Sequence, residues 1–208
     1  MLRATDVVGL AAAACAAAAL LVSLPGVAWL RRKAPLATLL VALALPLLPI
    51  GGLPAAGYLR GVLGDLSVTT TVLLLVYLLR PVLPLPTASE RSRLALQGLV
   101  ATGGLVLYPL ALGFGPADPY RLGFAHVGFL CTLLLLTVAS WYAGLQFVAT
   151  CLALAVLAWA IGALESRNLW DHLLDPLCAT WAVGALGRRL VGRQLDRRQL
   201  ERASSDTL

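Results

Sequence analysis

The segment VVGLAAAACAAAALLVSL, residues 7–24, decides the fold when it is read with PGVAWLRRK, residues 25–33, which follows it. The first segment holds no charged residue, and it is long enough for a helix to cross a bilayer, which takes about 17 to 25 residues. Three basic residues close the second segment, whereas only Arg3 and Asp6 are charged before the apolar run. A secretory leader has its positive charge first. The observed order therefore predicts an uncleaved transmembrane helix with its N-terminus outside.

The composition extends this interpretation to the whole chain of 208 residues. Hydrophobic residues make up 60% of it, charged residues only 12%, and its mean hydropathy is +0.86. A typical soluble domain has about twice that charged fraction, so lipid is the solvent that this composition fits. Of the 16 basic residues 15 are arginine, and we interpret this bias, with the abundance of alanine, leucine and glycine, as that of a GC-rich bacterial genome. The basic residues form no stripe interleaved with aromatic residues, so we expect no nucleic acid partner.

Further apolar runs follow the first, separated by polar turns or by turns rich in proline and glycine. They cover residues 36–53, 68–83, 94–112, 122–140, 145–164 and 177–186. Pro46 and Pro49 lie inside the second run and predict a kinked or broken helix there. The last run is short for a span and crosses only if it continues through Leu190 and Val191. We therefore predict an all-α, polytopic transmembrane helix bundle at residues 1–187, with seven spans, or six if the last run does not cross. An arginine-rich tail follows at residues 188–208.

The distribution of basic residues predicts the orientation of this bundle. With the N-terminus outside and seven crossings, 12 of the 16 basic residues face the cytoplasm, and the outer four are Arg3, Arg60, Arg121 and Arg167. The positive-inside rule predicts this asymmetry and a cytoplasmic C-terminus. We therefore expect a multi-pass protein of the bacterial inner membrane. The tail is predicted to lie on anionic lipid, and a docking site for a cytoplasmic partner is the alternative.

The same topology brings the polar connections of the outer side together and defines candidate binding residues. These are Arg60, Asp65, Asp118, Tyr120, Arg121, His126, Arg167, Asp171, His172 and Asp175. One interpretation is structural: Arg60 with Asp65, and Asp118 with Arg121, form ion pairs, while Asp65 and Asp118 cap or open helices. The other is an arginine-lined pocket for an anionic lipid headgroup, a phosphate or a partner peptide, because a guanidinium grips phosphate with two bonds.

The two histidines suggest a metal site or an acid-base site. His126, expected about one turn or more inside the fifth helix, and His172 could bind zinc together with a nearby aspartate. His172 could also act in proton transfer beside a carboxylate, with Ser67 or Ser140 as a nucleophile. The sequence has no HxxxH, HExxH or GxSxG pattern, so we predict no catalytic residue, no metal ligand and no cofactor. Gly103 and Gly104 in the fourth run predict a close approach of two helices.

The segment YLRGVLGDLSVT, residues 58–69, resembles an Arg/Asp-Leu-Ser segment of one bacterial family. It is similar to part of the membrane portion of the lipoteichoic-acid-synthase-like phosphoglycerol and phosphoethanolamine transferases. That family places the arginine and the aspartate closer together than Arg60 and Asp65, and its large sulfatase-like domain has no counterpart here. The resemblance implies a stand-alone membrane domain that works beside an envelope-modifying enzyme, and it assigns no catalytic residue.

The leading functional hypothesis is a non-enzymatic accessory or scaffold subunit that acts at the outer leaflet, with a lipid-linked envelope precursor. Its expected partners are membrane lipids and either another membrane protein or further copies of itself. A small transporter or channel is one alternative, although every acid and arginine falls at a predicted membrane boundary rather than at midplane. A membrane-embedded enzyme acting on lipid through the outer loops is the other.

Overall fold

The computed structural model describes the backbone of residues 3–205 and the side chains of residues 3–194. It is 76% helix and 2% strand, which confirms the all-α prediction. The helices in chain order are α1 (Ala4–Ser23), α2 (Pro25–Lys33), α3 (Pro35–Ala44), η1 (Leu45–Leu47), α4 (Ala55–Leu63), α5 (Val68–Leu79), α6 (Glu90–Ala111), η2 (Pro119–Gly123), α7 (Val127–Tyr142), α8 (Gln146–Ala160), α9 (Leu169–Leu173) and α10 (Pro176–Ser205). The side chains of tail arginines 197, 198 and 202 lie outside the described part.

Prolines divide the first two apolar runs into separate elements. Pro25 occupies the first position of α2, where its missing N–H costs nothing, and the three basic residues fall in the last turn of that helix. In the second run α3 ends at Ala44, a 3-10 turn follows, and the chain enters a hairpin of β1 (Pro49–Ile50) and β2 (Leu53–Pro54). Gly51 and Gly52 both have positive φ, which such a tight turn requires. The predicted break in this run is confirmed.

Residues 57–67, expected to form a polar loop, contain a helix. α4 begins at Ala55 and ends at Leu63, although Gly57 and Gly61 lie within it. Glycine disfavours a helix by about 1 kcal/mol, and packing outweighs that cost here. Ala56 is fully buried against Ala13 and Ala14 of α1. α4 therefore places Arg60 at a fixed position beside α1.

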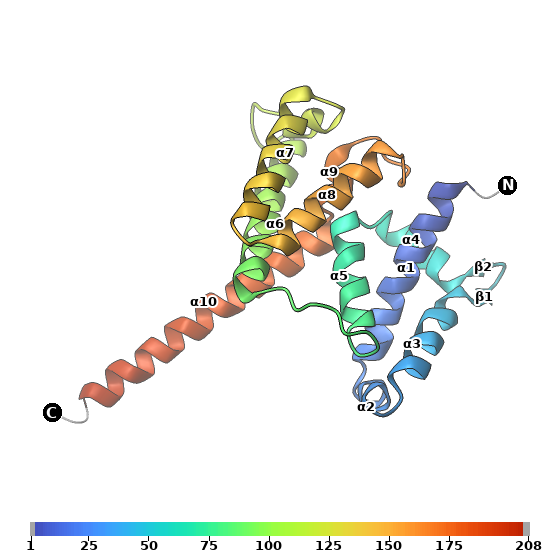
Figure 1. Ribbon diagram of the computed structural model, residues 1–208, viewed down its shortest axis with the longest axis horizontal. Helices are drawn as coiled ribbons and strands as arrows, with labels where there is room; N and C mark the ends of the chain where they lie inside the picture. The colour runs from blue at the N-terminus through green and yellow to red at the C-terminus, as the bar shows by residue number, and fades with distance from the viewer. Residues whose placement is uncertain (1–2, 206–208) are drawn as a thin grey trace.

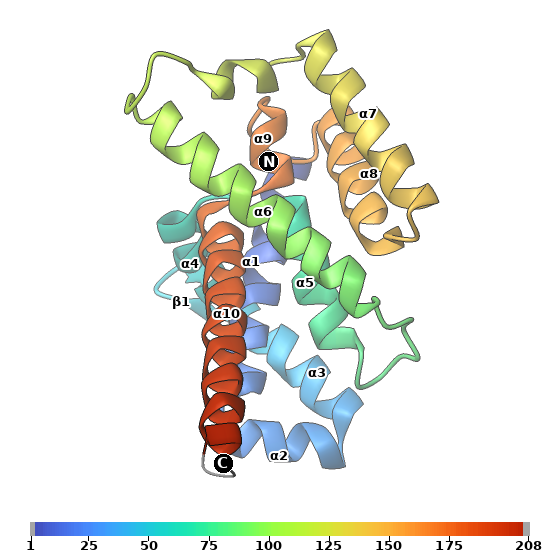
Figure 2. The ribbon, with the colours of Figure 1, turned by 90° about the vertical axis from the view of Figure 1, so that its left-hand side faces the viewer.

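The helices pack in two groups that meet along α5 and α8. α1 contacts α3, α4 and α5, while α7 forms a tight hairpin with α8, which also packs against α6 and α9 (Figures 1 and 2). α10 lies along α6, and a Cβ on Gly104 would come within 2.6 Å of the Cβ of Ala179. This contact confirms the predicted close approach of helices at Gly103 and Gly104. Beyond α6, α10 extends away from the rest of the molecule, continuing without a break past residue 187.

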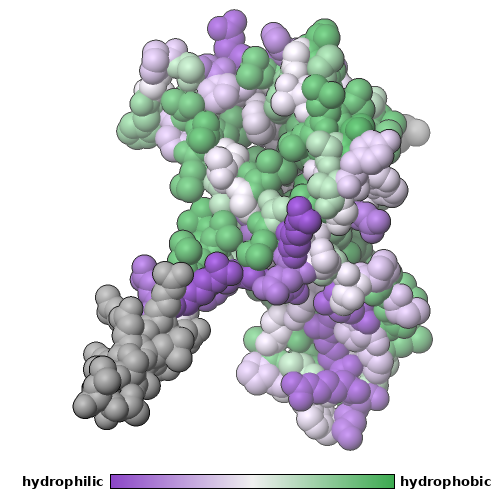
Figure 3. All heavy atoms as spheres, turned by 60° about the vertical axis from the view of Figure 1, so that its left-hand side comes forward, coloured by the Kyte–Doolittle hydropathy of each residue, from purple (hydrophilic) through white to green (hydrophobic). Residues whose placement is uncertain are grey.

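The connections gather at two ends of the molecule. The N-terminus, α4, η2 and α9 lie toward one end, which we call the Arg60 end (Figure 1). α2 and the connection between α5 and α6 lie toward the other, the Arg80 end. Large apolar side chains are exposed between them, as on α7, where Leu134 and Leu135 are 64% and 70% exposed. Figure 3 shows how much of one face is hydrophobic.

Within the described residues, two helices are long and apolar enough to cross a membrane: α1, with a mean hydropathy of 2.0, and α6, with 1.6. α5, α7, α8 and the pair α3–η1 are also apolar, but each has between 10 and 17 residues. By length and composition, α1 and α6 could therefore each cross a membrane.

Candidate functional site

Arg60 is the centre of a charged cluster at the Arg60 end. Its Nε donates to Oδ1 of Asp65 at 2.6 Å, its Nη2 to Oε1 of Glu165 at 2.8 Å, and its Nη1 to Oδ1 of Asp6 at 3.4 Å. The three carboxylates come from α1, from the connection after α4 and from the connection after α8. One guanidinium therefore ties together segments that lie up to 105 residues apart in the sequence. The predicted pair of Arg60 and Asp65 is confirmed.

Close packing on α1 fixes this cluster in place. A Cβ on Gly9 would lie 2.3 Å from Oδ1 of Asp65 and 2.4 Å from Nε of Arg60, so only glycine lets the pair rest on the helix. The side chains of Arg60 and Asp65 are 19% and 14% exposed. The hydrogen bond to Asp65 raises the pKa of Arg60 above its ordinary value, and Glu165 and Asp6 act in the same direction. With three carboxylates around one cation, this cluster repels a further anion.

A second polar cluster joins η2 to α9. Asp171 accepts hydrogen bonds through Oδ2 from the hydroxyl of Tyr120 at 2.8 Å and from the hydroxyl of Ser166 at 2.5 Å. Burial, with the bond to Asp171, raises the pKa of Tyr120 to about 12. Asn168 accepts from the backbone N–H of Trp170 and donates to the carbonyl of Tyr120 at 2.9 Å. The polar groups of these side chains are therefore hydrogen-bonded within the cluster itself.

Asp175 connects the first turns of α5 and α10. Its Oδ2 accepts from the N–H of Ser67 at 2.8 Å and from the hydroxyl of Thr70 at 2.5 Å, while its Oδ1 accepts from the N–H of Cys178 at 2.7 Å. The residue is only 6% exposed. A carboxylate with three donors in a buried position is a structural cap. Ser67, not Asp65, provides the side-chain cap of α5 itself.

His172 is fully buried inside the connection that α9 forms. Its Nδ1 lies 3.1 Å from the carbonyl oxygen of Asn168, and its Nε2 has no hydrogen-bond partner among the described residues. Burial lowers the pKa of His172 below its ordinary value, although Asp171 and Asp65 nearby act against that shift. The imidazole is therefore a neutral core group around neutral pH.

The side chains of the remaining candidate residues are exposed. Asp118 accepts from the N–H of Tyr120 and caps η2, as one of the two structural interpretations predicts. The expected pair of Asp118 with Arg121 is wrong, since within residues 3–194 no such ion pair forms. Arg121 and Arg167 are exposed.

His126 does not lie inside a helix as expected. It is the residue before α7 and is exposed, because the preceding Ala125 has a φ of 59° that interrupts the helix. His126 and His172 therefore do not share a site. In the part of the chain whose side chains are described, no group of three or more His, Cys, Asp and Glu residues could hold a metal ion.

Sequence reasoning missed several members of the two clusters. The partners of Arg60 include Asp6 and Glu165, and those of Asp171 and Tyr120 include Ser166 and Asn168. The one available signal was that all four lie on the predicted outer side, in or beside connections. Gly123 was also missed, although a Cβ there would lie 1.7 Å from Oδ1 of Asn168.

Comparison with protein-family models, with curated proteins and with solved structures finds no match for this chain. The geometry of the two ends must therefore carry the functional argument.

Proposed function

We propose that this chain is a multi-pass membrane protein of the bacterial inner membrane, with seven crossings and an outer N-terminus. It acts there as a non-enzymatic accessory or scaffold subunit. The exposed apolar side chains between the two ends support burial in lipid. The helices shorter than a full span can still cross where the bilayer thins around them or flanking side chains snorkel to the interface. The basic residues at the Arg80 end support its placement in the cytoplasm.

The observation that carries the scaffold proposal is the engagement of Arg60 by three carboxylates. Asp171 and Asp175 are likewise hydrogen-bonded within clusters of their own near this end, so these polar layers are already satisfied internally. An active site needs groups that are free to reach a substrate, whereas such a layer gives rigidity to a surface. Rigid outer connections suit a protein that holds a partner in place.

Arg121 and Arg167 are the side chains that we propose for contact with the partner or with an anionic headgroup. Both are exposed at the Arg60 end, on η2 and on the connection before α9. The notable change from the sequence-based hypothesis is that Arg60 is not available for this purpose. The resemblance of residues 58–69 to part of an envelope-modifying family suggests that this partner belongs to envelope biogenesis.

Photo-crosslinking in intact cells tests the scaffold proposal. A crosslinking amino acid at position 167 should capture a specific membrane protein or a lipid-linked precursor, whereas the same group at Thr87, exposed at the Arg80 end, should not. Arg121→Gln with Arg167→Gln should reduce recovery of that partner on co-purification. Substrate turnover by the purified chain alone would overturn the proposal.

The orientation is tested separately with a membrane-impermeant thiol reagent. Ala117→Cys should react in intact cells, and Thr87→Cys only after the membrane is permeabilised. The wild-type chain, in which only Cys131 of the four cysteines is exposed, gives the background. The reverse labelling pattern would show that the Arg60 end faces the cytoplasm.

A further inference from the structure

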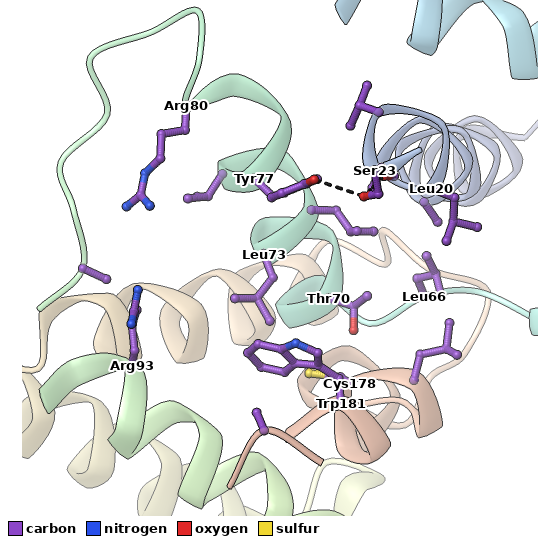
Figure 4. A pocket seen from close by; sticks show the side chains of 18 of the residues that line it. Leu20, Ser23, Leu66, Thr70, Leu73, Tyr77, Arg80, Arg93, Cys178 and Trp181 are labelled. Carbon is purple, nitrogen blue, oxygen red and sulfur yellow. Dashed lines mark hydrogen bonds between the residues drawn. The ribbon is translucent and has the colours of Figure 1, made fainter. Parts of the chain in front are cut away.

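A groove of about 1730 Å³ lies between the α1–α5 side of the molecule and the α6–α10 side. It is larger than most small-molecule sites, which measure about 300 to 1,000 Å³. Figure 4 shows Thr70, Leu73 and Tyr77 following one another along α5, with Leu66 in the connection before that helix and Cys178 and Trp181 of α10 facing them. Leu20 and Ser23 of α1 close the same side. The polar clusters around Arg60 and Asp171 do not line this groove.

The walls of the groove are apolar over a length that matches one leaflet. Leucine side chains make up much of the lining, and from Thr70 to Arg80 the helix α5 rises by about 15 Å. The hydrocarbon core of a bilayer is about 30 Å thick, so each leaflet contributes about half of that. An acyl chain that starts near Arg80 would end near Thr70, where the hydroxyl is already bonded to Asp175.

The Arg80 end of the groove is strongly basic. Six arginines line it: Arg31, Arg32, Arg80, Arg93, Arg188 and Arg189. Among the described residues, the lining contains no aspartate or glutamate. Arg31 stacks over the ring of Tyr77, and Arg189 bonds to Glu90, which lies outside the lining. Arg80 and Arg93 face each other across the groove in Figure 4, from the end of α5 and the start of α6. Positive charges gathered around one cavity favour the binding of an anion between them.

Gln97 supplies a second, independent sign of a ligand. It lines the groove, is only 6% exposed, and its Oε1 has no hydrogen-bond partner among the described residues. Buried polar atoms without partners are rare because desolvating them costs free energy. Gln97 lies one helical turn beyond Arg93, about 6 Å deeper along α6. This is the depth at which the glycerol and ester groups of a phospholipid follow its phosphate.

We propose that this groove binds an anionic glycerophospholipid of the leaflet at the Arg80 end. Its phosphate lies among Arg80, Arg93 and Arg188, its glycerol ester region faces Gln97, and its acyl chains run along α5 toward Thr70. Basic pockets between membrane helices are known to select such headgroups. The inference goes beyond the proposed scaffold function, and only the assignment of the leaflet to the cytoplasmic side rests on the proposed orientation.

The charge of the groove favours a lipid over a partner helix. A transmembrane helix that filled the groove would have to place an acidic segment among the arginines and leave the amide of Gln97 facing an apolar surface. A phospholipid suits both features with one molecule. Its headgroup is anionic, its ester oxygens can accept hydrogen bonds from Nε2 of Gln97, and a hydroxyl of a phosphatidylglycerol headgroup can donate one to Oε1.

Native mass spectrometry of the full chain in mild detergent tests the proposal, with phosphatidylglycerol and phosphatidylcholine of the same acyl chains as probes. Wild-type protein should bind phosphatidylglycerol more tightly. Arg80→Gln with Arg93→Gln should weaken that binding at least about tenfold, since each arginine near an anionic lipid contributes about a factor of five. The matched control is Lys33→Gln with Arg91→Gln, which removes the same charge at the same end from residues outside the lining. An equal loss of affinity for phosphatidylglycerol in both variants would show that the lipid is attracted by surface charge in general. That result would overturn the proposed binding in the groove.

Gln97→Leu separates binding from folding. Replacing an unpartnered buried amide by leucine should raise the melting temperature of the lipid-free protein, while the binding of phosphatidylglycerol becomes weaker. A lipid with brominated acyl chains should also quench tryptophan fluorescence in the wild type, and less in Trp181→Phe. Equal affinity for the two lipids, or a disulfide between two copies of Leu73→Cys in membranes, would show that no anionic lipid occupies the groove.

Discussion

The carboxylate of Asp175 accepts the backbone N–H of Ser67 at 2.8 Å, across 108 residues of sequence. The same group also binds Thr70 and Cys178, so it holds the starts of α5 and α10 together. These two helices form opposite walls of the groove. The spacing of the walls therefore depends on one buried carboxylate.

Asp175→Ala should lower the free energy of unfolding by about 3 kcal/mol or more. Three donors would lose their acceptor in a buried place, and each unsatisfied group costs about 1 to 3 kcal/mol. Thermal unfolding in detergent measures the loss. Asp118→Ala is the matched control, because this exposed aspartate caps only the short η2 and its removal should cost about 1 kcal/mol. Equal effects of the two variants would contradict the structural role of Asp175.

Arg60→Gln should destabilise the protein by about 2 kcal/mol, because Asp65, Asp6 and Glu165 would face one another without a cation. Glu165→Gln should change stability by no more than about 1 kcal/mol, since its side chain is 59% exposed and solvent weakens the pair. Adding Asp65→Asn to Arg60→Gln should recover part of the loss, a coupling that a double-mutant cycle measures. Additive losses would mean that the pair contributes nothing.

The sequence predicts the local parts of this cluster and not the distant ones. Arg60 and Asp65 lie five residues apart at a helix end, so their pairing follows from local geometry. Glu165 lies 105 residues from Arg60, and nothing short of the packed fold brings them together. The break at Pro46 is likewise local, because a proline beyond the first turn of a helix lacks the backbone N–H and its ring clashes with the preceding turn.

Two elements departed from expectation for reasons that lie outside local sequence. α4 forms despite its glycines because Ala56 packs against α1, and tertiary packing overrides propensity. α7 begins only after His126, since Ala125 takes a left-handed conformation that apolar periodicity does not reveal. The basic residues of the Arg80 end were predicted as topology anchors. Their convergence around one groove depends on how α5, α6 and α10 are placed in three dimensions.

Gly104→Ala should reduce stability by about 1 to 3 kcal/mol, because the new methyl group would meet the Cβ of Ala179 at 2.6 Å and push α6 away from α10. Gly98→Ala in the same helix is the control. A Cβ there meets nothing within 4 Å, so stability should stay the same or rise by up to about 1 kcal/mol. The melting temperatures of the two purified variants test this prediction. If neither substitution lowers the melting temperature, α6 and α10 pack less closely at Gly104 than the structure shows.

Stability should fall between pH 7.5 and pH 5.5, and His172 should cause part of that fall. Burial lowers the pKa of His172 in the folded protein below its ordinary value of 6.5. The unfolded chain therefore takes up a proton first as the pH falls, which favours unfolding. The stabilising contribution of the neutral His172 side chain is complete above about pH 6.5. It is lost as the pH drops toward the pKa of His172 in the folded state.

Unfolding of wild type and His172→Gln at both pH values tests this mechanism. The variant should lose part of the pH dependence even if it is less stable throughout, because glutamine does not titrate. His126→Gln, the same substitution at an exposed histidine, is the matched control. A pH dependence that survives unchanged in His172→Gln would show that the buried imidazole has no part in it.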